Sequence, residues 1–232
     1  MLQTLYGVRH PLFQKNVDMV DVHLNDVLLN IPNIATPSHK ENLVRFIAFS
    51  MVVFNACWYC YCHPWFNLIA FMSNIVILTT IVQIGLSLYL SNVRVEGSRI
   101  NFLAAYHLLS EVNCGLHLCV FLVYWIVLRK SIFAEHWGNF NNMFNTCMTH
   151  SFPQLAYLLD TMVTERRLVA WHAPYLYLPV TAVYGVINYV FTVYLRDRPV
   201  YFFMPWTDYK SLVVLLTLSL VFSCIYALIA WV

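Results

Sequence analysis

A histidine in the middle of an apolar stretch is the first residue of this sequence that could do chemistry. His150 lies in a run that extends from Asn145 through Pro153 to Asp160, and this run carries an amide, an imidazole, hydroxyls, a proline and a carboxylate. In hydrocarbon, each polar group costs free energy unless it is paired or faces a polar cavity. His150 is therefore either part of a chemical site or a histidine that is hydrogen-bonded for packing inside a helix bundle.

The spacing within this run limits the chemistry of His150. On a helix, Asp160 would lie about 15 Å along the axis from His150 and roughly 80° around it. Asp160 therefore cannot orient the His150 ring as the carboxylate of a catalytic triad would. Pro153 has no N–H and obstructs the carbonyl of Thr149, so we predict a bend beside His150. Such a bend would open a cavity or adjust packing.

The composition shows which kind of protein must position these residues. The 232 residues are 60% hydrophobic and only 10% charged, whereas about a quarter of the residues of a soluble domain are charged. The sequence therefore predicts an integral membrane protein with an all-α fold, a polytopic helix bundle. The formal charge of +2 comes without a basic run, so we expect no nucleic acid partner.

Six apolar stretches are long enough to cross a bilayer core of about 30 Å at 1.5 Å per residue. They are residues 43–62, 66–90, 101–128, 140–163, 174–195 and 211–231. Only His63–Pro64–Trp65 separates the first two, so we expect them to form a tight hairpin. Six spans place both termini on one face, and the larger number of Lys and Arg residues beside that face predicts that it is cytosolic or matrix-facing.

Residues 1–42 form a separate polar segment ahead of the transmembrane domain, 43–232. Three prolines interrupt the segment, and it lacks the apolar stretch of a cleavable signal peptide. Between Val17 and Leu29, apolar residues recur at helical spacing, which predicts a short amphipathic helix. The segment has no apolar core of its own, and we expect it to contact other membrane subunits.

Counting along the spans places polar residues from different spans at similar depth. At 1.5 Å per residue, His150 lies about 15 Å below one membrane face, and Ser73 and Asn188 lie about 10 Å below it. The layer predicted in this way contains residues of four spans, Ser73, His117, His150 and Asn188. A second layer nearer the termini would contain His107, Glu111 and Asp160.

The seven cysteines do not predict a disulfide framework or a metal centre. Their number is odd, and they lie in or beside the apolar stretches. Cys57 and Cys60 have the spacing of a metal-binding pair, but no second pair follows at a suitable distance. His63 is not placed as in a haem-attachment motif, because Cys62 intervenes. We expect neither a metal ion nor a cofactor.

Three of the spans resemble those of rolling-stone-like membrane proteins. The matching stretches are Phe66 to Asn74, Thr79–Thr80 and Gly85–Leu86–Ser87 in the second span, His150 to Leu158–Leu159–Asp160 in the fourth, and Pro179, Tyr184–Gly185–Val186, Asn188 to Phe191, Tyr201 and Pro205–Trp206 in and after the fifth. The resemblance covers residues 43–231, although each motif is short.

Rolling-stone-like proteins are in turn distantly similar to the androgen-induced-gene family of transmembrane hydrolases. Those enzymes cleave fatty acid esters of hydroxy fatty acids with a threonine nucleophile and a histidine. The resemblance places the nucleophile at Ser73 and the histidine at His150. This sequence departs from the family in having serine instead of threonine, and Met143–Phe144–Asn145–Thr146 where the hydrolases have Trp–Leu–Asn–His.

Two functions are therefore open. In a lipid-ester hydrolase, Ser73 would attack the ester with His150 as general base, and Asn188 or His117 would support them. Such an enzyme would belong to the endoplasmic reticulum or the plasma membrane. In a non-catalytic accessory subunit of a larger membrane complex, the same residues would hold the bundle together. We prefer this second interpretation, and we then expect the mitochondrial inner membrane.

Overall fold

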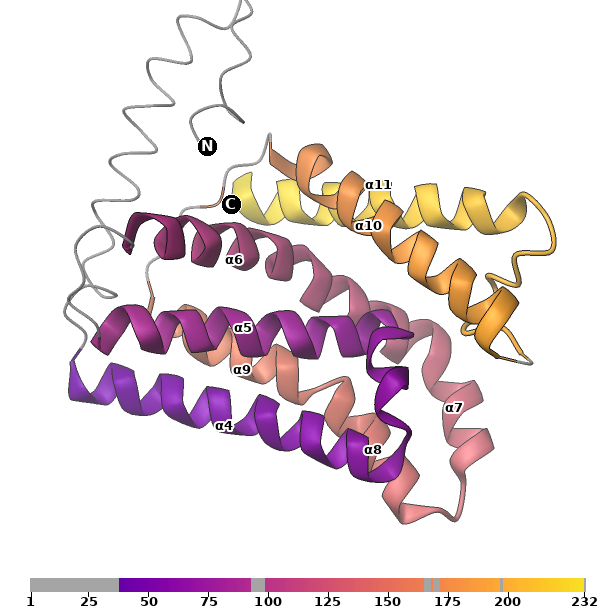
Figure 1. Cartoon of the computed structure of the whole chain (residues 1–232), viewed down its shortest axis with the longest axis horizontal. Coiled ribbons are helices and arrows are strands. Elements are labelled where there is room, and N and C mark those ends of the chain that lie inside the picture. The colour runs from indigo at the N-terminus through magenta and orange to yellow at the C-terminus, as the bar shows by residue number, and fades with distance from the viewer. Residues whose placement is uncertain (1–37, 93–98, 165–167, 169–171, 197, 232) are drawn as a thin grey trace, which may run out of the picture.

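The computed structural model describes residues 38–92, 99–164, 168, 172–196 and 198–231 (Figure 1). These residues form helices and no strands, which confirms the predicted all-α bundle. The amphipathic helix predicted between Val17 and Leu29, and nearly all of the polar segment 1–42, lie outside the described residues. The described part of the segment belongs to the first turn of α4.

The helices follow the predicted apolar stretches closely. They are α4 (His39–Cys62), η1 (Trp65–Ile69), α5 (Met72–Asn92), α6 (Arg99–Leu122), η2 (Val123–Leu128), α7 (Arg129–His136), α8 (Phe140–Thr149), α9 (Phe152–Met162), α10 (Ala173–Val190), η4 (Phe191–Leu195) and α11 (Lys210–Trp231). In the described part of the chain, five helical stretches are long and apolar enough to cross a membrane. The chain is a polytopic membrane protein.

The fourth predicted span is a broken helix and not a continuous one. Its halves, α8 and α9, have 10 and 11 residues, about half of what a bilayer core requires. His150 leaves the helical conformation at φ −102° and ψ 5°, and Pro153 lies in the first turn of α9. The predicted bend beside His150 is thus confirmed, and it is a full interruption. Such a break is tolerated at membrane depth when protein surrounds it.

The start of α4 has a clear physical cause. The hydroxyl of Ser38 accepts a hydrogen bond from the backbone N–H of Glu41, and the Glu41 carboxylate accepts one from the backbone N–H of Ser38. This capping box satisfies two of the N–H groups that a helix start leaves unpaired. At its other end, α4 stops at Cys62, and η1 begins after Pro64. The predicted tight hairpin is therefore present.

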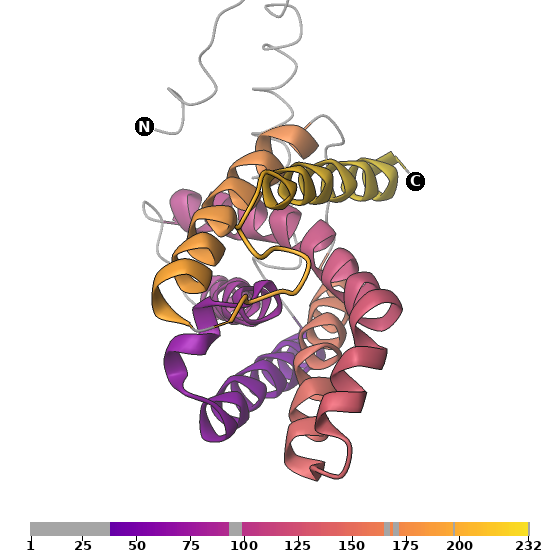
Figure 2. The same ribbon diagram turned by 90° about the vertical axis from the view of Figure 1, so that its right-hand side faces the viewer.

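The helices alternate in direction across the bundle. The start of α4 and the end of α11 lie at the same end of the bundle (Figure 1). Helices α4, α5 and α9 pack against one another, and α10 packs against α11. Helix α6 lies between these two groups and contacts both (Figure 2).

Two glycines allow α10 to approach α6 and α11 closely. A Cβ atom at Gly115 of α6 would lie 2.5 Å from the hydroxyl oxygen of Tyr177 in α10. A Cβ atom at Gly185 of α10 would collide with the side chain of Leu215 in α11. Small residues at helix crossings of this kind are a common way of packing transmembrane helices.

Candidate functional site

His150 lies at the break between α8 and α9, and its ring is stacked on an aromatic ring. The ring centroids of His150 and Tyr124 are 3.7 Å apart, with 10° between their planes. Tyr124 belongs to η2, a π-helical stretch that continues α6. Within the described residues, the Nδ1 atom of His150 is buried without a hydrogen-bond partner. The ring is therefore held by stacking.

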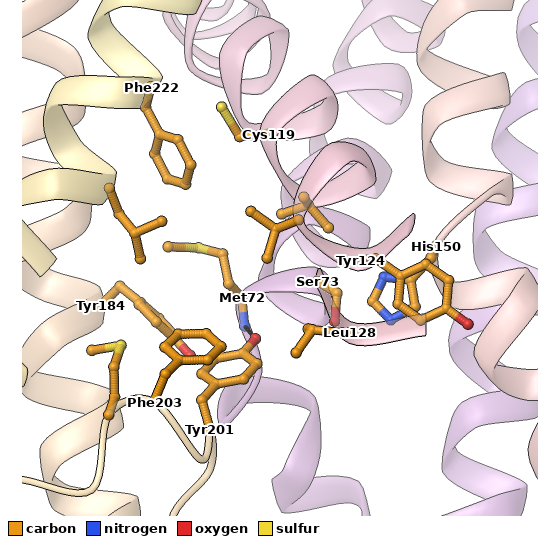
Figure 3. A pocket seen from close by; sticks show the side chains of 14 residues that line it. Met72, Ser73, Cys119, Tyr124, Leu128, His150, Tyr184, Tyr201, Phe203 and Phe222 are labelled. Atoms are coloured by element: carbon orange, nitrogen blue, oxygen red, sulfur yellow. Dashed lines mark hydrogen bonds between the residues drawn. The ribbon is translucent and has the colours of Figure 1, made fainter. Parts of the chain in front are cut away.

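Ser73 lies in the first turn of α5, and its side chain lines the same cavity as His150. The cavity has a volume of about 50 Å³. Figure 3 shows the stacked rings of Tyr124 and His150 on one side of it, with Tyr201 and Phe203 on another. Its lining is almost entirely apolar, and the remaining labelled residues are Met72, Cys119, Leu128, Tyr184 and Phe222.

The geometry of this cavity does not resemble a formed nucleophile–base pair. Among the described residues, no hydrogen bond joins the Ser73 hydroxyl to the His150 ring, whose Nδ1 atom has no partner. A volume of about 50 Å³ holds a few water molecules, whereas sites for larger ligands occupy about 300–1,000 Å³. The two residues share a cavity, but in this conformation the cavity has no room for a lipid ester.

The loop after η4 closes one side of the cavity. The backbone N–H of Met72 donates a hydrogen bond to the Tyr201 hydroxyl over 3.2 Å. Burial raises the pKa of Tyr201 above its ordinary value, so this hydroxyl stays protonated at neutral pH. Tyr201 therefore anchors the loop to the start of α5, beside Ser73.

Asn188 lies behind the cavity wall and does not line the cavity. Its Nδ2 atom donates a hydrogen bond to the Tyr184 hydroxyl over 3.0 Å, and its Oδ1 atom accepts one from Trp206 Nε1 over 2.7 Å. The side-chain amide is thus engaged in holding α10 against the following loop. The structure therefore does not place Asn188 beside Ser73 and His150, the pair that it was predicted to support.

His117 faces a different part of the molecule. Its Nε2 atom lies 2.9 Å from the hydroxyl oxygen of Thr80, and its ring lies against Tyr157 with 4.6 Å between centroids. His117 lines a second, larger groove and not the cavity of Ser73 and His150. The predicted layer of four residues is therefore divided: Ser73 and His150 meet at one cavity, and the other two have separate partners.

The second predicted layer is divided as well. Glu111 of α6 lies 3.1 Å from His172 Nδ1 and accepts a hydrogen bond from the Tyr226 hydroxyl over 2.8 Å. These partners belong to the α10–α11 side of the bundle. Asp160 has its partners in α4, in α5 and in the N-terminal part of α6. Glu111 and Asp160 thus belong to two different polar clusters.

An ion pair that the sequence reasoning missed lies at the centre of the α4–α5–α9 group. Arg45 and Asp160 are both fully buried, and Nε of Arg45 lies 3.8 Å from Oδ1 of Asp160. The guanidinium also donates to the Ser91 hydroxyl over 3.1 Å and to the Thr164 hydroxyl over 3.2 Å. Near the start of the predicted stretch 43–62, Arg45 is expected among the charges beside the membrane face. The sequence signal that could have identified its role is that Arg45 lies inside this apolar stretch, where a charge needs a partner.

Polar side chains of α5 and α6 extend this ion pair into a buried network. Gln83 and Tyr106 donate hydrogen bonds to Oδ2 of Asp160 over 3.1 and 3.2 Å. Asn113 donates to Gln83 Oε1 over 2.8 Å, and Thr79 donates to Asn113 over 2.7 Å. The network connects α4, α5, α6 and α9 in the interior of the bundle.

No group of three or more His, Cys, Asp or Glu side chains in the described part of the chain is placed to hold a metal ion. The seven cysteines are free thiols. Comparison of the chain with protein-family models, with curated proteins and with solved structures finds no match. The resemblance to rolling-stone-like proteins and to transmembrane hydrolases therefore stays a prediction from the motifs.

Proposed function

We propose that this polytopic membrane protein is a non-catalytic accessory subunit of a larger membrane protein complex. The observation that carries the proposal is the cavity of Ser73 and His150, which is apolar and has a volume of about 50 Å³. An ester substrate does not fit into it, and stacking on Tyr124 occupies one face of the His150 ring. A histidine held in this way contributes packing between the α8–α9 break and η2.

The polar interior supports the same proposal. The most extensive buried network, around Arg45 and Asp160, is formed entirely by contacts among helices of this chain. The outer faces of α4, α10 and α11 expose large apolar side chains such as Phe46, Val186 and Leu216. These faces suit lipid or the apolar helices of neighbouring subunits. A subunit of this kind would belong to a complex of the mitochondrial inner membrane.

Isolation of the tagged chain in a mild detergent, followed by native mass analysis, tests this function. We expect the chain to migrate in a complex much larger than its own 27.1 kDa and its detergent. Ser73→Ala should leave the complex intact, because it removes one small hydroxyl. Replacing residues 1–37 with an unrelated polar segment of equal length, which keeps the capping box of α4, should release the chain. Migration of the unaltered chain as a monomer would refute the proposal.

A hydrolase is the second candidate, because Ser73 and His150 line one cavity. Catalytic hydrogen bonds are often long or absent without substrate, and opening of the Tyr201 loop would enlarge the cavity. The purified protein is treated with a serine-reactive fluorophosphonate, next to a membrane hydrolase that reacts. We expect no labelling of this chain. Labelling at Ser73 that disappears in His150→Ala would establish the hydrolase instead.

A further inference from the structure

A large groove between α6 and α9 is separate from the cavity of Ser73 and His150. Its volume is about 830 Å³, within the range of about 300–1,000 Å³ that is typical of ligand sites. One wall is a face of α6 that carries Cys114, His117, Leu118 and Phe121 at helical spacing. The other is a face of α9. Ile229 of α11 contributes to the lining as well.

The rim of the groove is apolar and open to the surroundings of the bundle. Leu158 and Met162 of α9 are 55% and 81% exposed, and Leu118 and Phe121 of α6 are 38% and 37% exposed. In a membrane these side chains face the hydrocarbon of the bilayer. A ligand can therefore enter the groove sideways from the lipid, without crossing the aqueous phase.

One of the residues that line the groove is a buried polar side chain, Gln154. Gln154 is only 9% exposed, and both its Oε1 and its Nε2 atoms are buried without a hydrogen-bond partner in the described part of the chain. Gln154 lies in the first turn of α9, directly after the break, near the middle of the α8–α9 span. An amide buried in hydrocarbon is costly unless a partner satisfies it. A bound molecule would supply that partner.

The chemistry of the lining restricts the ligand. Gln154 presents a donor and an acceptor together, which complements a hydroxyl group, because a hydroxyl both accepts and donates. Among the described residues that line the groove there is no Asp, Glu, Lys or Arg, so these residues supply no counter-charge to a charged group. We propose that the groove between α6 and α9 binds a neutral lipid with a free hydroxyl group, which hydrogen-bonds to the amide of Gln154.

Sterols and diacylglycerols share this chemistry, and the experiment distinguishes them. The full-length protein is reconstituted into phosphatidylcholine vesicles that contain a trace of one photoreactive probe: a sterol, a diacylglycerol or a phosphatidylcholine. We expect the sterol or the diacylglycerol to label peptides of α6 and α9 more strongly than phosphatidylcholine does. Labelling by only the sterol probe or only the diacylglycerol probe identifies the class of lipid that binds. Equal labelling by phosphatidylcholine would overturn the proposal, because any acyl chain would then fill the groove.

Three variants locate the site. Gln154→Leu should lower labelling of the groove about two- to tenfold, because the loss of one hydrogen bond weakens binding by about that factor. Leu158→Trp places a bulky side chain at the rim and should lower labelling as well. Leu216→Trp on the exposed face of α11 is the matched control, since Leu216 is 62% exposed and does not line the groove, and it should have no effect. Undiminished labelling in both Gln154→Leu and Leu158→Trp would overturn the proposal.

Discussion

At the scale of single residues, the main feature is an ion pair that is buried among the helices, away from both water and lipid. Arg45 and Asp160 each have 0% side-chain exposure, and hydrogen bonds from Gln83 and Tyr106 satisfy the carboxylate further. Taking charges out of water is expensive, and only good geometry and added hydrogen bonds offset the cost. The pair therefore contributes chiefly to the specificity of the fold. Any arrangement of the helices that separates the two residues leaves one charge buried without its partner, which raises its free energy.

This argument predicts a strong asymmetry between single and double substitutions. Asp160→Leu alone leaves a buried guanidinium unpaired and should destabilise the protein by about 3–5 kcal/mol. The double variant Arg45→Met with Asp160→Leu should recover most of that loss. Thermal unfolding in detergent measures both. Asp208→Asn, which breaks the exposed 3.5 Å pair with Lys210, is the control and should change stability by less than about 1 kcal/mol. A double variant no more stable than Asp160→Leu would contradict this account.

His150 provides a second prediction at this scale, because its observed contact is a stack. His150→Phe preserves an aromatic ring against Tyr124 and should leave stability nearly unchanged. His150→Ala removes the ring and should cost about 3 kcal/mol through the space left behind. The same thermal measurement compares the two variants. A large loss in His150→Phe would show that the imidazole nitrogens, and not the ring, are what the fold requires.

At the scale of elements, close helix crossings depend on the absence of single side chains. The hydroxyl of Tyr177 accepts a hydrogen bond from the backbone N–H of Gly115 over 2.9 Å and donates one to the carbonyl of Glu111 over 2.7 Å. It can do so only because Gly115 has no Cβ. The crossing of α6 and α10 is thus defined by a glycine and a tyrosine. Gly85 of α5 is different, because a Cβ there would meet Phe49 at an ordinary 3.5 Å.

Alanine substitutions at Gly115 and Gly85 should therefore change the stability of the protein in opposite directions. Gly115→Ala forces Tyr177 away and should destabilise the bundle by about 1–3 kcal/mol. Gly85→Ala meets no obstacle and should stabilise α5 by up to about 1 kcal/mol, because alanine favours the helix more than glycine does. Unfolding of both variants in the same detergent tests the difference. Equal destabilisation by both would mean that helix packing, as described, does not distinguish these positions.

At the scale of the whole molecule, the alternation of the helices defines two ends of the bundle. The start of α4 and the end of α11 lie at one of these ends (Figure 1). The connections from α7 to α8 and from η4 to α11 lie at the other. Two different sets of exposed positions should therefore face the two sides of the membrane.

Cysteine labelling from one side of sealed vesicles checks this arrangement. In a variant whose exposed native cysteines are replaced, single cysteines are introduced at Lys40, Trp231, Trp137 and Tyr209, which are all exposed. A membrane-impermeant maleimide should label Lys40→Cys and Trp231→Cys from one side, and Trp137→Cys and Tyr209→Cys from the other. Labelling of Lys40→Cys and Trp231→Cys from opposite sides would show that the number of crossings is odd.

The span positions could be predicted from the sequence because apolar length is a local property. The predicted stretch 211–231, for example, lies within α11 (Lys210–Trp231). The break beside His150 was also predictable, since Pro153 acts on its own helix. Partners across helices were not, because depth along a helix says nothing about the direction in which a side chain points. Ser73 and Asn188 have similar predicted depths, but only Ser73 reaches the cavity of His150.

The buried pair of Arg45 and Asp160 also has a consequence for the order in which the chain is made. Arg45 and Thr164, at the two ends of this cluster, are 119 residues apart, which is about 6–24 s of translation at roughly 5–20 residues per second. Ser91 follows Arg45 by only 46 residues, so the nascent α4–α5 hairpin can shelter the guanidinium first. The two halves α8 and α9, each too short to insert alone, then arrive at an acceptor surface that already holds the partners of Asp160.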